Sequence, residues 1–392
     1  MLRGEGLAAL KQLRLKQCDL MAPQADAELS ACLSQLPTGL EHLSISSIRA
    51  NRVTAKFPTI ALQNLQKLTY LELAGTFLRA PDETTPAMQP LQALTRLVDL
   101  RLNILGVSSI SAEMLCATHH LTRLELVRSD LDSKCRVEAG VLASKSRLQH
   151  LRIDRCQVLG AATGQAQLLS YLQPLQELTY LHLGSGRPTD SITSRRCRPG
   201  VIVYNPDATG SPPVAAYAAL TASSKLQLLN ISYSVLPESV WLQMFPTHRR
   251  LPYLTSLDIS RVTLVHRTRF LLSNDAPECS CPVRCCPGLQ ELEMQGLLTF
   301  TTLLTPLQGL SKLHTLHLNP PRSGISPGDL RGVSQLTGLK ELSLSFSGGD
   351  FGRNGMFLLL PLTQLKQLTL LECVYDGRVR YGCWTQKVRC HL

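Results

Sequence analysis

The densest group of residues that could do chemistry is a set of four cysteines: Cys279, Cys281, Cys285 and Cys286. Four thiolates can enclose a zinc ion tetrahedrally, and neighbouring thiols can form disulfides or react. Their C-x-C-x3-C-C spacing differs from the paired C-x2-C knuckle, however, and no histidine lies among them. Cys286 also stands three residues before Leu289, at a position expected to face a core. A metal site, a reactive or disulfide-forming pair and a purely structural role all remain open. The last is favoured, and we predict no metal and no cofactor.

The remaining candidates for catalysis are weaker. His119 and His120 come just before an expected strand, and no nucleophile elbow or other local signature accompanies them. The glycine-rich run at 348–355 lacks the Lys-Ser/Thr pair of a phosphate-binding loop. We therefore expect no enzymatic activity.

What dominates the chain is a short repeated pattern of leucines. The pattern Leu-x-x-Leu-x-Leu occurs thirteen times, with conservative replacements, at intervals of mostly 24 to 30 residues. The copies begin at Leu10, Leu40, Leu68, Leu97, Leu121, Leu148, Leu178, Leu226, Leu254, Leu289, Leu313, Leu339 and Leu365. In the copy at Leu68, alternation of Leu71 and Leu73 with polar residues predicts a strand with one buried face. Upstream, Leu62 and Leu65 have the spacing of a helical turn. Each unit should be a strand, a turn and a return helix, which become stable only when stacked.

The copy at Leu10–Leu20 matches a known consensus throughout, including Cys18 in its Asn/Cys position, which Cys156 and Cys373 fill in their own copies. With these motifs the chain resembles the leucine-rich-repeat family over about residues 7 to 375. Repeat lengths are most similar to the ribonuclease-inhibitor-like and cysteine-containing classes. The resemblance implies an α/β solenoid (a horseshoe) with parallel strands on the concave face and helices on the convex face. Other residues fill the Asn/Cys position elsewhere: Thr76, Ser129, Ser234 and Val262.

The repeats also give the expected organisation of the chain. An array of about thirteen repeats should occupy 1–373, interrupted by an inserted loop rich in Gly, Pro and Ser at 185–213 and by a cysteine-rich loop at 273–286. Residues 374–392 should be a C-terminal cap or tail, and an Asp-Gly pair at 376–377 predicts a hairpin there.

Composition bears on partners and compartment. The chain has 40 basic and 29 acidic residues, a net charge of +11, but no block of five like charges. Its thirteen cysteines are an odd number without the spacing of a disulfide scaffold. There is no apolar run of signal-peptide length and none of 18 residues, so we expect no membrane insertion. The cytoplasm is the expected compartment; family association alone suggests the cytoskeleton or the ciliary axoneme as an alternative.

The outward side chains of the strands form the expected binding surface. Early copies supply basic and aromatic side chains: Tyr70, Arg101, Arg123, Arg152, Tyr180 and His182, together with Arg14, Lys16, His42 and His150. Later copies supply acidic ones: Glu291 and Glu293, together with Asp258 and Glu341. The competing interpretation is local cancellation by Asp99, Glu125 and Asp154. Thirteen strands about 4.8 Å apart would span on the order of 60 Å, which suits a protein better than a small-molecule substrate.

These features favour a non-catalytic scaffold or adaptor that binds a protein partner through the concave face. The alternative is the substrate-recognition subunit of an F-box-type ubiquitin ligase, which would require a longer N-terminus. Nucleic-acid binding ranks last, because the surface lacks dense Lys/Arg interleaved with aromatic residues.

Overall fold

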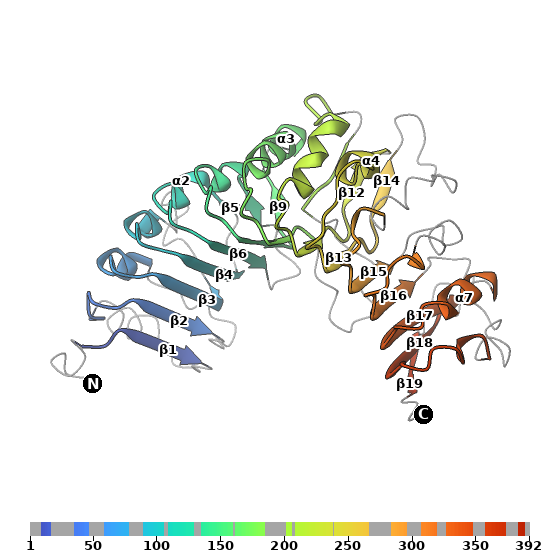
Figure 1. Ribbon diagram of the computed structural model, residues 1–392. Helices are drawn as coiled ribbons and strands as arrows, with labels where there is room; N and C mark the ends of the chain where they lie inside the picture. The colour runs from blue at the N-terminus through green and yellow to red at the C-terminus, as the bar shows by residue number, and fades with distance from the viewer. Residues whose placement is uncertain are drawn as a thin grey trace. The chain divides into compact units, whose positions relative to one another are not determined.

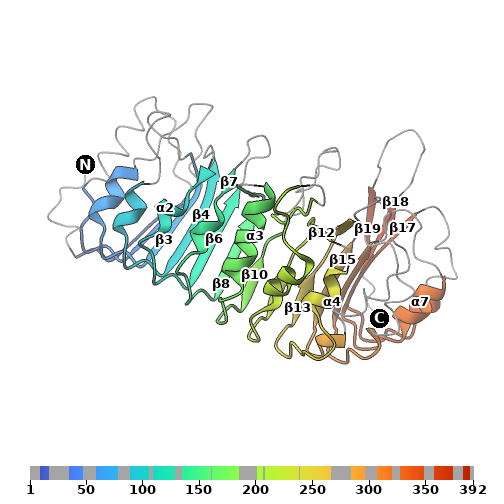
Figure 2. The ribbon, with the colours of Figure 1, turned by 90° about the horizontal axis from the view of Figure 1, so that it is seen from above.

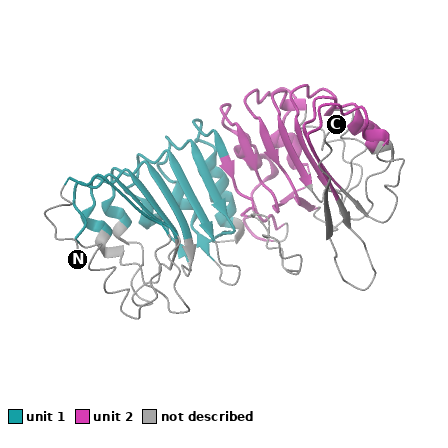
Figure 3. Cartoon of the chain, turned by 90° about the horizontal axis from the view of Figure 1, so that it is seen from below, with its two compact units in different colours: residues 1–180 teal, residues 181–392 magenta. Residues whose placement is uncertain are grey.

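The computed structural model describes residues 9–16, 35–46, 59–77, 89–105, 109–128, 135–159, 161–184, 201–205, 208–237, 239–265, 284–295, 307–319, 327–347, 357–373 and 383–388. These residues belong to two compact units, residues 1–180 and 181–392, which are coloured separately in Figure 3.

The first unit is built on a parallel sheet. Its strands follow one another in the sheet in chain order: β1 (Gln12–Lys16), β2 (His42–Ser46), β3 (Tyr70–Phe77), β4 (Asp99–Leu105), β6 (Arg123–Arg128) and β8 (His150–Asp154). Each strand pairs in parallel with the next, as Figure 1 shows. Corresponding residues of the repeat lie opposite one another, so that Leu71, Leu100, Leu124 and Leu151 form one continuous row. All four are fully buried, and this row is the centre of the core.

Most of the described return segments of the first unit are 3₁₀ turns where helices were expected. They are the 3₁₀ turns η2 (Thr59–Asn64), η3 (Gln89–Ala93) and η4 (Ala139–Leu142) and the helices α2 (Ala112–Leu115) and α3 (Ala161–Leu172). Of these described segments, only α3 exceeds two turns. A 3₁₀ turn rises about 2.0 Å per residue, against 1.5 Å in an α-helix, so fewer residues cover the same distance. The expected inward pair is confirmed, because Leu62 and Leu65 are both 1% exposed. Figure 2 shows α2 and α3 against one face of the sheet.

A second, small sheet accompanies the first. It consists of β5 (Ser109–Ile110), β7 (Arg136–Val137) and β9 (Gln157–Val158), each of which follows a long strand in the chain. The pairing is again parallel, with Arg136 opposite Gln157.

The second unit repeats the plan. Its parallel strands are β11 (Leu228–Asn230), β13 (Ser256–Asp258), β15 (Glu291–Gln295), β16 (Thr315–Asn319), β17 (Glu341–Ser347) and β18 (Gln367–Cys373). A separate pair is formed by β12 (Val235–Pro237) and β14 (Thr263–Val265), and the return segments include η5 (Val214–Thr221), α4 (Val240–Met244) and α7 (Pro327–Ser334). The last strand, β19 (Cys383–Val388), is antiparallel to β18. The Asp-Gly pair between these strands lies outside the described residues.

Part of the expected inserted loop is packed into the core. Residues 185–200 lie outside the described part of the chain, but Val201 and Ile202 are each 1% exposed. The Tyr204 amide donates to the carbonyl of Val235, and the Tyr204 ring meets Tyr217 edge-on at 6.5 Å. Residues 201–204 are therefore an ordered extension of the core and not part of the expected surface loop.

One charged side chain is buried among the return segments of the first unit. Lys145 is 1% exposed, and its ammonium group donates to the carbonyl of Leu115 at 2.7 Å. The same carbonyl accepts from the amide of Thr118 at 3.1 Å and from its hydroxyl at 2.8 Å. Burial lowers the pKa of Lys145, against a smaller opposite effect of Cys116. The ammonium group is thus costly to bury and is not needed to satisfy this carbonyl.

We expect Lys145→Met to raise the free energy of unfolding by about 1 kcal/mol near neutral pH, since the apolar stem is kept and the buried charge is removed. Because the folded-state pKa of Lys145 is lowered, the wild-type protein gains stability as the pH rises toward the unfolded value. The advantage of the variant should therefore shrink toward about pH 10. Urea denaturation of the variant and the wild type, near neutral pH and near pH 10, measures this difference in the free energy of unfolding. A loss of stability near pH 7 would show that the bond to Leu115 outweighs the burial cost.

Candidate functional site

The open face is the face of the first unit's sheet opposite its buried leucines. Two rows of its side chains lie in register across the strands. One row contains His42, Tyr70, Asp99, Arg123 and His150. The other row contains Arg14, Ser44, Glu72, Arg101, Glu125 and Arg152. Period-2 alternation along each strand and parallel register between strands place them there.

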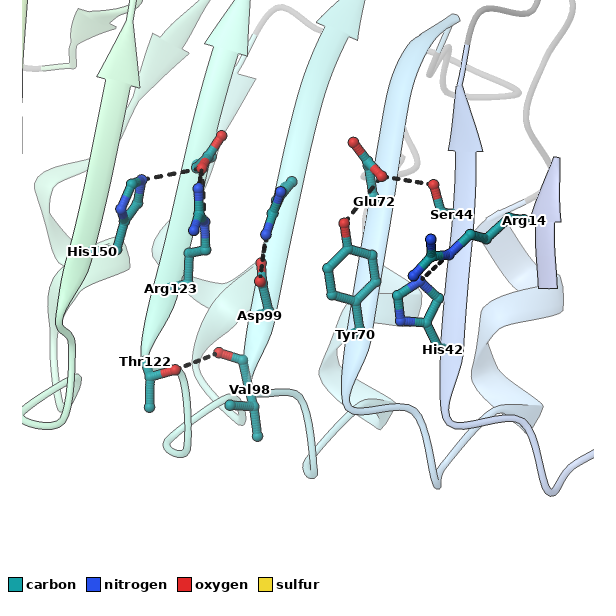
Figure 4. Close-up of polar contacts among 12 residues, drawn as sticks. Arg14, His42, Ser44, Tyr70, Glu72, Val98, Asp99, Thr122, Arg123 and His150 are labelled. Atoms are coloured by element: carbon teal, nitrogen blue, oxygen red, sulfur yellow. Dashed lines mark hydrogen bonds and ion pairs between the residues drawn. The ribbon is translucent and has the colours of Figure 1, made fainter. Parts of the chain in front are cut away.

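Four side chains from four repeats form one cluster at one end of the open face. The rings of His42 and Tyr70 lie 3.9 Å apart and nearly parallel, at 6°. Arg14 reaches the other side of this pair and donates from Nε to Nε2 of His42 at 3.2 Å (Figure 4). The guanidinium of Arg101 lies over the Tyr70 ring, 5.2 Å from its centroid, at cation–π distance. Burial and the charge of Arg14 lower the pKa of His42, which keeps its ring neutral near pH 7.

The hydroxyl of Tyr70 is also fixed. It donates to Oε2 of Glu72 at 3.0 Å, and the hydroxyl of Ser44 donates to the same oxygen at 2.6 Å (Figure 4). Burial and the bond to Glu72 raise the pKa of Tyr70 to about 12. Both the ring and the hydroxyl of Tyr70 are thus held before any partner arrives.

Three arginines of the open face, unlike Arg14, are paired with carboxylates on their own strands. Arg101 donates to Asp99 through two nitrogens, at 3.0 and 2.9 Å. Arg123 donates to Glu125 through Nε at 2.8 Å and also through Nη2. Arg152 donates to Asp154 at 2.9 Å. The local cancellation considered from the sequence is present, and these three pairs form along the strands.

A second aromatic stack stands on the far side of these pairs. His150 and Tyr180 have ring centroids 3.8 Å apart, inclined at 12°. Nε2 of His150 lies 3.1 Å from Oε1 of Glu125, which is also the acceptor for Arg123 (Figure 4). Burial alone would raise the pKa of Glu125, but the hydrogen bonds from His150 and Arg123 outweigh it and lower the pKa to about 2.

We expect Glu125→Gln to lower the free energy of unfolding by about 1–2 kcal/mol at pH 7, a value reduced for solvent screening of this partly exposed group. The folded-state pKa is lowered from 4.5 to about 2, so the carboxylate stabilises the fold above pH 4.5 and loses its effect as the pH falls to about 2. The difference between variant and wild type should shrink by more than half by about pH 3.

Chemical denaturation at these pH values tests the prediction, with Glu113→Gln as a control at an exposed glutamate of α2. A deficit that is the same at pH 3 and pH 7 would contradict it.

The structure brings five of the eight candidate binding residues together. Tyr70, Arg101, Arg123, Arg152 and Tyr180 are half-buried neighbours on the first unit. His182 follows on β10 (Tyr180–His182) but is only 8% exposed, so little of its ring is available. The other two belong to β15 of the second unit: Glu291 is exposed and Glu293 is half-buried. Sequence reasoning missed Glu72, although its position two residues after Tyr70 places it on the same face.

The residues considered for catalysis or metal binding have other surroundings. Among the described residues, no group of three His, Cys, Asp or Glu could hold a metal ion. Cys285 is buried, with its sulfur 3.4 and 3.3 Å from the carbonyls of Phe245 and Pro246, and Cys286 is fully buried, as its spacing from Leu289 predicted. Cys279 and Cys281 lie outside the described residues, as does the glycine-rich run at 348–355. His119 is exposed and meets the hydroxyl of Ser144.

The strands decide the fold. Each of the thirteen leucine motifs contains one strand, from β1 in the copy at Leu10 to β18 in the copy at Leu365, with β10 in the copy at Leu178. The chain is a leucine-rich-repeat solenoid. No helix in the described part of this solenoid is long and apolar enough to span a membrane.

Comparison with known proteins gives matches among solved structures alone. No family model and no curated protein matches the sequence. An internalin from Listeria monocytogenes is similar over 93% of this chain and 88% of its own, with 17% identity and a TM-score of 0.49. A leucine-rich-repeat protein of Leptospira interrogans covers 92% of this chain and 97% of its own, with 15% identity and a TM-score of 0.42. The plant peptide hormone receptor RGFR1, in complex with RGF2, is similar over 93% of this chain and 52% of its own, with 14% identity and a TM-score of 0.46.

Proposed function

We propose that this solenoid is a non-catalytic scaffold or adaptor that binds a partner protein through the open face of the first unit. The observation that carries the proposal is the pair of preformed His–Tyr stacks, His42 with Tyr70 and His150 with Tyr180. Tyrosine and arginine are enriched among the few residues that carry most of the binding energy of a protein interface. Because the two tyrosines are already held by neighbouring rings, little side-chain entropy is lost when a partner contacts them.

The charge pattern of the open face favours a protein partner over nucleic acid. Arg101, Arg123 and Arg152 each already have a carboxylate partner on the same strand. A phosphate would have to displace that carboxylate and would meet its repulsion, whereas a protein partner can contact the pair and its neighbouring ring as they stand.

The second unit offers a separate, acidic surface for contact. Its parallel strands carry Glu291 and Glu293, with Glu341 and Asp258 at equivalent outward positions. We propose that these carboxylates contact a basic region of the partner. No described residue bears on the ubiquitin-ligase alternative, which remains a prediction, as does the cytoplasmic location.

The experiment compares the proteins captured by the intact chain with those captured by a triple variant, Tyr70→Ala, Arg123→Ala and Tyr180→Ala, by proximity labelling and pull-down in the cells that express it. We expect the triple variant to lose the partners that both methods find with the intact chain. The matched control replaces Arg147 and Tyr253, which are exposed on turns outside the open face, with alanine. An unchanged partner set with a folded triple variant would refute the proposal.

A further inference from the structure

Two buried cysteines, 21 positions apart in the sequence, meet beside the small sheet of the first unit. Cys135 comes directly before β7, and Cys156 comes directly before β9. Because β7 and β9 are parallel with Arg136 opposite Gln157, the two cysteines stand opposite each other, and the Gln157 amide donates to the carbonyl of Cys135 at 2.9 Å. Neighbouring strands lie about 4.8 Å apart, inside the range of about 4.4–6.8 Å that a disulfide requires between Cα atoms.

Both side chains are free thiols, and the residues are 2% and 3% exposed. Each thiol shifts the pKa of the other, as neighbouring ionisable groups do. Cys156 is fixed further by the carbonyl oxygens of Asp154 at 3.5 Å and Leu126 at 3.9 Å. The strand register, the backbone hydrogen bond and the burial therefore agree on a pair that no local cysteine motif indicates.

We propose that Cys135 and Cys156 are a dithiol site that hydrogen peroxide converts into a disulfide, covalently joining two successive repeats. Peroxide is the oxidant named because it is small enough to reach a site from which larger disulfide reagents are excluded. The link would tie together the repeats of β6 and β8, which present Glu125 and His150 to the open face.

The surroundings of the two thiols differ, and this difference decides which one attacks the peroxide and which one completes the disulfide. The neighbouring thiol of Cys156 lowers the pKa of Cys135, against the effect of burial and with the help of the Arg128 guanidinium. The Cys135 thiol and burial raise the pKa of Cys156. Since the thiolate is the nucleophile, Cys135 attacks first and Cys156 is the resolving thiol.

The chemistry balances with one peroxide. The Cys135 thiolate attacks one peroxide oxygen, the O–O bond breaks, and the products are a sulfenic acid on Cys135 and hydroxide, which takes up the proton that Cys135 released and becomes water. The sulfur of Cys156 then attacks the sulfenic sulfur, the S–O bond breaks, and the S–S bond forms. The departing hydroxide takes the proton of Cys156 and leaves as a second water. Two thiols are oxidised and one peroxide is reduced to two waters.

The test treats the full, reduced chain with hydrogen peroxide, stops the reaction with catalase, alkylates the remaining thiols in denaturant, and maps the peptides by mass spectrometry. We expect a peptide pair linked through Cys135 and Cys156, lighter by two hydrogen atoms and restored by dithiothreitol. The exposed thiol of Cys116 is the internal indicator that peroxide has acted. If Cys116 is oxidised while Cys135 and Cys156 are both alkylated, or if Cys135 is over-oxidised without a link, the proposal is overturned.

Two variants test whether the link depends on this particular pair or forms at any buried thiol. Cys156→Ser should abolish the link, and Cys285→Ser, at a buried thiol of the second unit, should leave its yield unchanged. The thermal midpoint gives a second measurement on the wild-type chain: we expect the oxidised form to melt several degrees above the reduced form, since a native cross-link restricts the unfolded state. Equal midpoints despite a mapped link would overturn its role as a clamp between repeats.

Discussion

Replacing Trp241 with alanine is expected to lower the free energy of unfolding by about 3–5 kcal/mol, the usual cost of removing a buried aromatic ring. Trp241 lies on α4 and is 1% exposed, with its ring 6.3 Å from that of the fully buried Phe245. Tyr217 of η5, the segment that packs against α4, is also fully buried. An alanine leaves a cavity that these rigid rings cannot close.

Urea denaturation followed by far-ultraviolet circular dichroism measures the loss. The neighbouring residue gives a matched control, because Leu242 is on the same short helix but is 39% exposed. Leu242→Ala should change the free energy of unfolding by less than about 1 kcal/mol. Similar costs at the two positions would show that this aromatic cluster is not a close-packed core.

The sheet could be predicted from the sequence because a single physical requirement fixes it. Leu71, Leu100 and Leu124 occupy the same position in their repeats and meet in register. Any slip by one residue would expose every one of them, so the motif determines the strand, its inward face and its pairing at once. The outward residues follow by alternation, which is why Tyr70 and Arg123 were placed on the open face.

What the pattern could not give is how outward side chains pair with one another. Asp99 lies in register with Arg123 and on the same strand as Arg101, and both distances are reachable by long side chains. The structure selects Arg101, because its fork meets both carboxylate oxygens of Asp99 while its plane covers the Tyr70 ring. Such selection depends on three repeats together and not on any one motif.

The irregular segments also show that the repeat pattern does not give contacts between segments. Composition predicts a surface loop at 185–213, yet the short apolar run Val-Ile-Val-Tyr at 201–204 packs into the core despite the surrounding Gly and Pro. The cysteine pair of the first unit is a second example of a contact that the sequence pattern did not give. Sequence reasoning drew attention to the dense cysteines at 279–286, whereas Cys135 and Cys156 are brought together only by the register of two strands of two residues each.

If stacked repeats stabilise one another, the same substitution should cost more stability at an inner strand of the array than at β1. Leu124 is fully buried between Leu100 and Leu151 on the neighbouring strands. Leu13 fills the same position in β1, but it pairs with Leu43 on one side and is only half-buried. Leu124→Ala should cost about 3–5 kcal/mol, and Leu13→Ala about 1–2 kcal/mol, although the chemical change is identical.

Denaturation of both variants, with Leu360→Ala as an exposed control, measures this difference. The physical reason is that a solenoid layer gains its burial from two neighbours, so a layer with one described neighbour has about half of that contact to lose. If the two leucines cost the same, the stability of the first unit would not come from nearest-neighbour stacking. In that case its open face would not be held rigid by the layers beneath it, and the prearranged His–Tyr stacks would lose the support on which their proposed role depends.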